Sequence, residues 1–114
     1  IKIPFCSGGI VCIIYSMFIH AVQFEVKPKE VLTYRKDSKM WAEVAKRAKG
    51  FIAYFTMGRL AFKDQYISVY EWKTKRDHDH FMNKYHDSLV NKSKARVKVL
   101  GYYNLKAIDK LRGK

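Results

Sequence analysis

Four segments of this sequence are rich in aromatic and β-branched residues, and two others carry apolar side chains at the three- and four-residue spacing of an amphipathic helix. The strand-like segments cover residues 17–27, 51–57, 65–73 and 97–105, and the helix-like segments cover residues 29–48 and 75–86. Their order, β-α-β-β-α-β, is that of the ferredoxin-like split βαβ arrangement. We therefore expect an α+β fold whose antiparallel sheet carries both helices on one face.

Turn and cap residues support the boundaries of these segments. Pro28 is typical of a first helical turn, Gly50 is expected to be the left-handed cap after Lys49, and Thr74 is a candidate N-cap. Residues 58–63 are expected to form a turn that joins the second and third strands into a hairpin. A further short helical turn is expected at residues 88–90.

The expected strands are apolar on both faces. In the second strand, alternate faces hold either Phe51, Ala53, Phe55 and Met57 or Ile52, Tyr54 and Thr56. Two helices cover one face of such a sheet, and large exposed apolar patches are rare on soluble monomers. We therefore expect a homodimer whose sheets pack face to face about a two-fold axis, forming an α+β barrel. The alternative is that the N-terminal apolar run folds back over this face.

The length of 114 residues suits one domain, which we assign to residues 17–108, with a basic tail at residues 109–114. Residues 1–16 are interpreted as an N-terminal extension ahead of a natural start at Met17, with a signal peptide as the second interpretation. The apolar run at residues 9–19 is too short to span a bilayer as a helix. We expect a cytoplasmic protein with no membrane partner, and assign no role to Cys6 and Cys12.

Three stretches of the chain resemble the antibiotic-biosynthesis-monooxygenase-like domains of the dimeric α+β barrel superfamily. They are the strand at residues 17–26, the helix containing Trp41 that leads into Lys49-Gly50-Phe51, and the run YISVYEWKT at residues 66–74 before a helix. The resemblance covers about residues 17–105. It implies a homodimer with one ligand pocket in each subunit, between the helices and the sheet.

Some members of that family oxidise polycyclic aromatic substrates without metal or flavin. The resemblance thus implies a small monooxygenase-like protein that acts on an aromatic or quinone-type substrate with no cofactor and no metal. The pocket is expected to be lined by some of four residues, Gln23, Tyr54, Trp72 and Phe81. Two of them have an alternative role in packing, Trp72 as a cap of the core and Tyr54 as part of a cross-strand pair. No catalytic residue is assigned.

A haem-degrading branch of the same family uses an Asn on the first strand, a Trp on the second helix and a haem-ligating His after it. The corresponding positions here hold Gln23, Phe81 and Asn91, although His86 lies near the last of them. None of the three matches. Haem degradation is therefore disfavoured.

Histidines and aspartates alternate at the start of the second helix, but His78 and His80 point about 200° apart on a helix and do not share one ion. His78 falls on the apolar stripe with Met82, and His80 falls nearer solvent. His20 shares a strand face with apolar residues, so it is interpreted as a core histidine. A general base would also need a desolvated environment and a substrate proton within reach.

The chain has 23 Lys and Arg against 10 Asp and Glu, a formal net charge of +13. Residues 92–114 contain eight basic residues and one acidic residue, Asp109, and the first helix carries a second basic cluster. This excess favours anionic partners and makes a non-catalytic binding module for nucleic acid or another anionic ligand the alternative function. The third strand lacks the Gly-bearing motif of RNA-recognition domains, and a charged surface also serves solubility.

Overall fold

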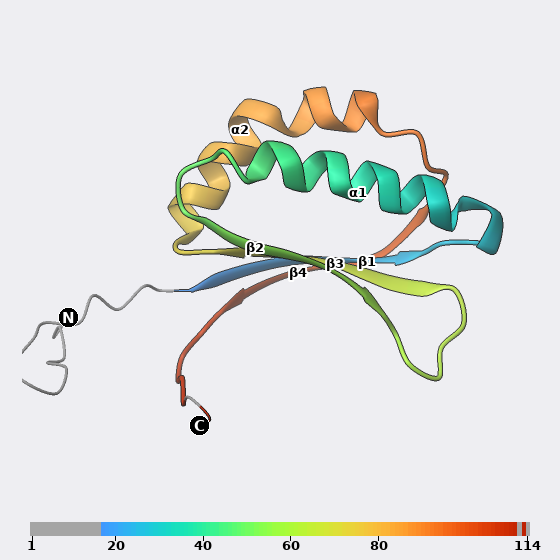
Figure 1. Ribbon diagram of the computed structural model, residues 1–114. Coiled ribbons are helices and arrows are strands. Elements are labelled where there is room, and N and C mark those ends of the chain that lie inside the picture. The colour runs from blue at the N-terminus through green and yellow to red at the C-terminus, as the bar shows by residue number, and fades with distance from the viewer. Residues whose placement is uncertain (1–16, 112, 114) are drawn as a thin grey trace, which may run out of the picture.

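The computed structural model describes residues 17–111 and 113, and it has the predicted element order. The strands are β1 (Phe18–Glu25), β2 (Phe51–Gly58), β3 (Gln65–Trp72) and β4 (Lys98–Lys106), and the helices are α1 (Val31–Ala45) and α2 (Lys75–Lys92). Both helices lie on one side of the sheet (Figure 1). The sheet order is β2-β3-β1-β4 and each neighbouring pair is antiparallel, which confirms the ferredoxin-like α+β fold.

The first helix is interrupted near its start. Residues Pro28–Glu30 form a short 3-10 turn, and α1 then begins at Val31 and ends at Ala45, a few residues before the predicted end. Pro28 fixes this start because it has no backbone N–H to donate and its φ is preset for a helical turn. Gly50 has φ +84°, so the predicted left-handed position after the helix is confirmed.

The second helix is longer than predicted. The sequence indicated a helix over residues 75–86 and a separate turn at residues 88–90, but α2 is one helix of 18 residues that continues to Lys92. The polar run His86-Asp87-Ser88 suggested a break. Leu89 continues the stripe of Phe81 and Tyr85 at four-residue spacing and is 2% exposed, so packing holds the last turns in place.

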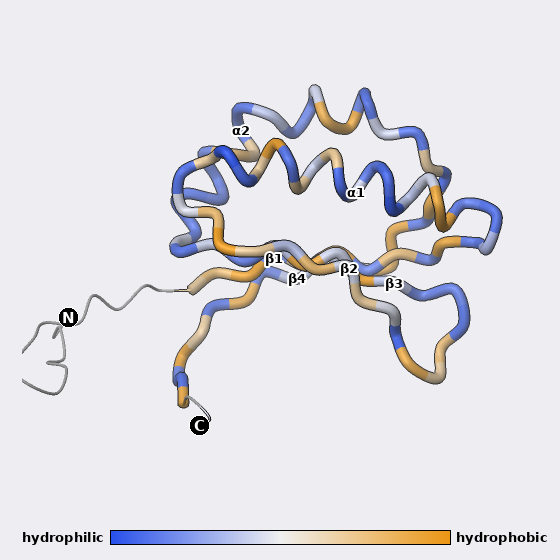
Figure 2. The backbone as a smooth tube through the Cα atoms, in the orientation of Figure 1, coloured by the Kyte–Doolittle hydropathy of each residue, from blue (hydrophilic) through white to orange (hydrophobic). Residues whose placement is uncertain are grey.

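The core lies between the helices and the sheet. Its buried residues come from two strands and both helices: Phe18, Ala45, Trp72, Phe81 and Leu89. In Figure 2 both helices alternate between hydrophilic and hydrophobic residues along their length. Such alternation is what a helix with one buried stripe requires.

The register decides which strand residues face the helices. Phe18, His20 and Val22 on β1 are paired with Trp72, Tyr70 and Ser68 on β3, and Phe18 and Trp72 at these even-numbered positions belong to the core beneath the helices. Successive strand residues point to opposite faces. The odd-numbered residues of β1 and β3 therefore form the outer face of the sheet.

Neither α1 nor α2 covers the outer face (Figure 1). Phe55, Met57, Tyr103 and Leu105 lie there and are exposed, with Phe55 at 44% and Leu105 at 53%. The hairpin between β2 and β3 and the end of β4 bend away from the helices on this side. As predicted, the sheet in residues 17–111 has apolar side chains on both faces, whereas the helices cover only one of them.

Two sequence-based assignments include residues outside the described part of the chain. The N-terminal extension at residues 1–16, with Cys6 and Cys12, lies outside the described residues, as do Arg112 and Lys114 of the basic tail. The division into a domain at residues 17–108 and a tail stays a prediction. Within the described chain, neither helix combines the length and apolar character needed to cross a bilayer.

Candidate functional site

A cavity of about 300 Å³ lies between the helices and the inner face of the sheet. This volume is at the lower end of the range for small-molecule sites. Aromatic and apolar side chains from β1, β3, β4 and both helices make most of its wall, including Val22, Phe24, Tyr34, Trp41, Tyr70, Trp72, Phe81, Met82, Val97 and Tyr102. The polar residues among them are fewer, and one of them is acidic: His20, Asp37, Ser38, Ser68, His78, His86 and Ser93.

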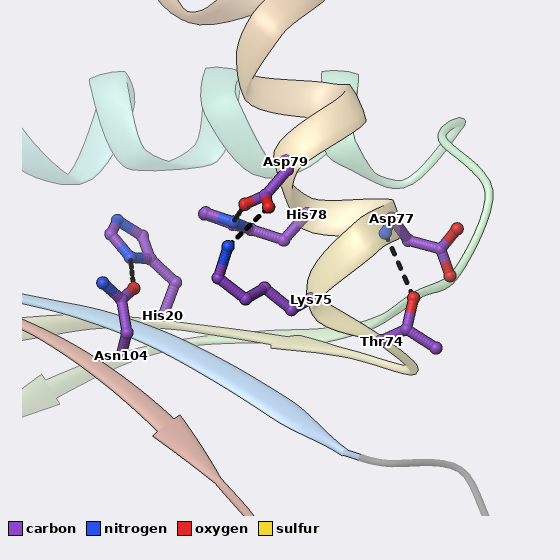
Figure 3. A network of polar contacts seen from close by, with 7 residues as sticks. All are labelled: His20, Thr74, Lys75, Asp77, His78, Asp79 and Asn104. Carbon is purple, nitrogen blue, oxygen red and sulfur yellow. Dashed lines mark hydrogen bonds and ion pairs between the residues drawn. The ribbon is translucent and has the colours of Figure 1, made fainter.

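Two histidines from different elements meet at this cavity. His20 on β1 and His78 in the first turn of α2 have ring centroids 4.7 Å apart, and both line the cavity. Figure 3 shows the two imidazoles side by side above the sheet. The strand alternation places His20 on the inner face, and the apolar stripe of α2 carries His78 toward it.

Each imidazole is held through Nδ1. His20 Nδ1 lies 2.8 Å from Asn104 Oδ1 on β4, and His78 Nδ1 lies 3.0 Å from the Asp79 carboxylate (Figure 3). An amide oxygen and a carboxylate accept hydrogen bonds, so Nδ1 carries the proton in both rings. The lone pair of each neutral imidazole is therefore on Nε2.

The surroundings of His78 favour its neutral form. Burial lowers the pKa of His78 below its ordinary value and outweighs the opposing effect of the hydrogen bond that His78 donates to Asp79. Asp79 also accepts a hydrogen bond of 2.6 Å from Lys75 Nζ, and that bond is the main reason why the pKa of Asp79 is lowered. The cavity thus contains an imidazole that is neutral near pH 7 beside an ionised carboxylate.

Two buried nitrogen atoms at the cavity have no hydrogen-bond partner: Nε1 of Trp72 and Nε2 of His78. Trp72 is 1% exposed and His78 is 8% exposed, and their ring centroids are 6.0 Å apart. Buried polar atoms are nearly always hydrogen-bonded, so these two unpaired nitrogen atoms, here called the orphan nitrogens, require an explanation. Here one orphan is a donor and the other an acceptor, and both belong to residues that line one cavity.

Tyr34 and Tyr70 also belong to the cavity wall, and the ring of Tyr70 lies 6.4 Å from that of His20. The Tyr34 and Ser68 hydroxyls are 2.6 Å apart and buried between α1 and β3, and Tyr54 Oη lies 3.3 Å from the same Ser68 Oγ. Burial raises the pKa of Tyr34 to about 12 and the pKa of Tyr70 well above its usual value. These phenols stay protonated near neutral pH, so they act as hydrogen-bonding groups rather than bases.

Only two of the four residues that the sequence suggested for the pocket line the cavity. Trp72 and Phe81 line the cavity. Tyr54 is not part of the wall but approaches it through Ser68. Gln23 requires a correction, because its odd-numbered position on β1 places it on the outer face, where it bonds Gln65 and Tyr103.

Sequence reasoning placed His20 and His78 on apolar faces but did not bring them together. The signal for His78 was its position on the stripe of Met82, and both residues do line the cavity. Their pairing depends on where α2 begins relative to β1, which no local pattern encodes. His80 is exposed, as its position on the helix predicted. Across residues 17–111 and 113, no cluster of three metal-ligating side chains is found.

Comparison with known proteins adds information on the fold only. No protein-family model and no curated protein matches the chain. Among solved structures, the oxygenase SnoaB from Streptomyces nogalater, described as cofactor-independent, is similar with a TM-score of 0.69 and 10% identity, covering 86% of this chain and 99% of that chain. A conserved protein of unknown function from Bacteroides thetaiotaomicron is similar with a TM-score of 0.64 and 17% identity, covering 82% and 99%.

A third similar structure comes from Nitrosomonas europaea, and its description assigns it provisionally to the antibiotic biosynthesis monooxygenases. It has a TM-score of 0.64 and 13% identity, covering 86% of this chain and 96% of that chain. Each of these structures is matched over nearly its whole length, so the similarity concerns the complete domain. The chain therefore has the fold of the antibiotic-biosynthesis-monooxygenase-like domains, as its sequence indicated.

Proposed function

We propose that this protein binds a planar aromatic or quinone-type molecule in the cavity and oxygenates it with dioxygen, without a cofactor. The observation that carries this proposal is the pair of orphan nitrogens, Trp72 Nε1 and His78 Nε2, in an aromatic-lined cavity. A ligand that presents one oxygen to both atoms would satisfy a donor and an acceptor together. Because both nitrogen atoms are buried, a ligand would reach them after a local rotation of neighbouring side chains.

His78 is suited to act as the base. Its Nδ1–H donates to the Asp79 carboxylate, which orients the ring and stabilises the imidazolium that forms when Nε2 takes a proton. The lowered pKa of His78 keeps Nε2 free near neutral pH. A phenolic substrate, or the enol form of one whose CH₂ is conjugated with a ring carbonyl, would lose its O–H proton to this atom. The resulting anion carries carbanion character at the ring carbon that was the CH₂.

Trp72 is suited to stabilise the charge that this proton transfer leaves on the substrate oxygen. Its indole N–H is fixed in the core by Phe51 and Phe81, whose ring centroids are each 5.3 Å from that of Trp72. A donor fixed in a desolvated site lowers the energy of an oxyanion without reorganising. His78 and Trp72 therefore have complementary roles at one substrate oxygen.

The reaction balances with dioxygen as the oxidant. The carbanion gives one electron to dioxygen, and the substrate radical and superoxide combine to form a C–O bond. The imidazolium of His78 returns its proton to the peroxide, which then loses water to give a carbonyl. One oxygen atom enters the product, the other leaves as water, and the CH₂ carbon is oxidised by four electrons.

Turnover of anthrone under isotopically labelled dioxygen tests this function. We expect one labelled atom in the anthraquinone product and a rate above that of the protein-free reaction. Trp72→Phe keeps the ring and removes the N–H, so we expect kcat to fall about 100-fold; His78→Gln removes the base, with a loss of about 100-fold or more. His80→Gln, at an exposed position on the same helix, is the matched control. Absence of both binding and turnover of tricyclic phenols would contradict the proposal.

We also propose that the protein works as a homodimer that buries the outer face of the sheet. Phe55 and Met57 from β2 and Tyr103 and Leu105 from β4 supply apolar surface at both edges of that face. A chain of side-chain hydrogen bonds, here called the polar line, runs between these two edges. Tyr103 donates to Gln23, and Gln23 donates to Gln65. Arg59 donates to the same Gln65 oxygen. An apolar face with an internally satisfied polar line is well suited to a partner of the same kind.

A further inference from the structure

The cavity opens to solvent between α2 and β4. Four of its lining residues are exposed at this place: His86 and Val90 on α2, and Val99 and Tyr102 on β4. Tyr102 is 67% exposed, although it lies on the helix side of the sheet. Neither helix extends over this edge strand, so a ligand enters here.

One end of this opening is closed by the segment at residues 93–97, which runs from the end of α2 down to β4 (Figure 1). Ser93, Ala95 and Val97 are half-buried and line the cavity. The residues between them, Lys94 and Arg96, are exposed. The segment is therefore a wall one backbone thick, apolar inside and basic outside, and exposed Lys92 and Lys98 continue the basic side at its two ends.

Two carboxylates hold this wall against α1. Asp37 accepts the backbone N–H groups of Lys94 and Ala95 at 2.9 and 2.7 Å, and Glu30 accepts that of Arg96 at 3.0 Å. Ser93 Oγ accepts from Trp41 Nε1 at 2.9 Å and donates to the Leu89 carbonyl. The wall is fixed by its backbone, which leaves the basic side chains free to act on a ligand.

Positive charge dominates around this end of the opening. Four of the seven residues at 92–98 are basic, Lys92, Lys94, Arg96 and Lys98, and none is acidic. The acidic residues that contact this segment are Glu30 and Asp37, and Asp37, which also lines the cavity, accepts two of its backbone N–H groups. The Debye length is about 10 Å at 0.1 M salt, so charges one backbone away from the cavity act on a molecule inside it. Such a field raises the local concentration of anions and their rate of entry.

We propose that the aromatic ligand of this cavity carries an anionic group, such as a carboxylate or sulfonate, which lies at the wall formed by residues 92–98. This inference rests on the proposed function, because it assumes that the cavity takes an aromatic ligand. It also gives the bound molecule a defined orientation. The ring system lies toward Trp72 and His78, and the anionic group lies toward Lys94 and Arg96.

Two fluorescent dyes with the same ring skeleton test the inference on the full chain. Anilinonaphthalene sulfonate is an anion, and phenylnaphthylamine is its neutral counterpart. At about 20 mM salt we expect the anionic dye to bind at least tenfold more tightly, and at about 300 mM salt we expect most of this advantage to be lost. The Kd of the neutral dye should change little with salt.

Substitutions test which residues are responsible for the tighter binding of the anionic dye. The double substitution Lys94→Gln and Arg96→Gln is expected to weaken the anionic dye about tenfold at low salt and to leave the neutral dye unchanged. Lys46→Gln with Lys49→Gln is the matched control, since Lys46 lies nine residues beyond Asp37, roughly 13 Å further along the helical direction. Ala95→Trp fills the cavity and should abolish binding of both dyes.

The outcomes separate the two proposals. Equal affinity for the two dyes, or an equal loss in the control variant, overturns the anionic ligand and leaves the aromatic cavity intact. Failure of both dyes to bind overturns the aromatic cavity and the inference with it. Dye binding that survives Ala95→Trp lies on another surface, such as the outer face of the sheet, and also overturns the inference.

Discussion

His78 connects the stability of the protein to pH. Its neighbours are His20, Asp79, Lys75 and the rings of Phe18 and Trp72, and its pKa is lowered mainly by burial. The folded state therefore binds fewer protons than the unfolded state at a pH below the unfolded value of about 6.5. The free energy of unfolding is expected to fall as the pH decreases from about 6.5 toward the range in which carboxyl groups titrate.

Urea denaturation across this pH range measures the effect. His78→Gln should flatten the slope, whereas His80→Gln, at an exposed position, should retain it. The lowered pKa of Asp79 gives stability that is present above its unfolded pKa of about 4 and lost below it, outside this range. An unchanged slope in His78→Gln would show that His78 is not desolvated in the folded protein.

Gly50 occupies a position at which both the backbone conformation and the available space require glycine. Its φ of +84° is unfavourable for other residues, and a Cβ at this position would collide with the carboxyl group of Asp77. We expect Gly50→Ala to lower the free energy of unfolding by about 2 kcal/mol or more. Gly58→Ala is the control, because the nearest atom to a Cβ there is 4.0 Å away. Equal urea midpoints for the two variants would contradict this account.

At the scale of single elements, α2 depends on its N-cap. Thr74 has extended backbone angles, and its Oγ1 accepts the Asp77 N–H at 3.1 Å (Figure 3). Thr74→Ala should cost about 1 kcal/mol of stability, and Thr74→Ser should recover most of it. Because His78 lies in the same first turn, a frayed cap would also displace the proposed base. Thermal denaturation and anthrone turnover of the pair measure both effects.

The order and type of the elements could be predicted because their patterns are local. Alternation in the strands, and Pro28, Gly50 and Thr74 at the helix ends, each indicate a structure without knowledge of the rest of the chain. The end of α2 could not be predicted in this way. Its last turns are polar in sequence and are held by Leu89 in the core and by Ser93, which bonds Trp41 from α1.

The candidate site was predicted less completely for a similar reason. The resemblance led to Trp72 and Phe81, which line the cavity, but it gave no means of choosing which strand face meets the helices. Gln23 was therefore assigned to the wrong side of the sheet. The meeting of His20 and His78 depends on the packing angle of α2 over β1, and that angle is set by contacts distant in sequence.

At the scale of the whole molecule, the proposed dimer makes a simple prediction. Light scattering should give twice the chain mass of 13.4 kDa, because the exposed apolar side chains of the outer face would pack against a second copy. Phe55→Lys with Leu105→Lys places charges at two sites on that face and should yield monomers. Leu32→Lys, exposed on α1, is the matched control. A monomeric wild-type protein would contradict the proposal.

Nucleic-acid binding stays a prediction as the alternative role of the basic surface. A single-stranded oligonucleotide should then bind with an affinity that falls steeply between about 50 and 200 mM salt. The aromatic cavity would have no part in that binding, so Ala95→Trp would leave it unchanged. The two functions are therefore separable in one set of variants.

The pairing of β1 with both β3 and β4 has a consequence for how this molecule is made. Among the described strands, β1 is thus hydrogen-bonded to the one farthest from it in sequence. During synthesis, β1 is made well before this neighbour, and until β4 leaves the ribosome the cavity lacks the side that Val99 and Tyr102 supply. Chaperones would thus meet a nascent chain whose aromatic interior is still open, and that interior would close only as β4 docks.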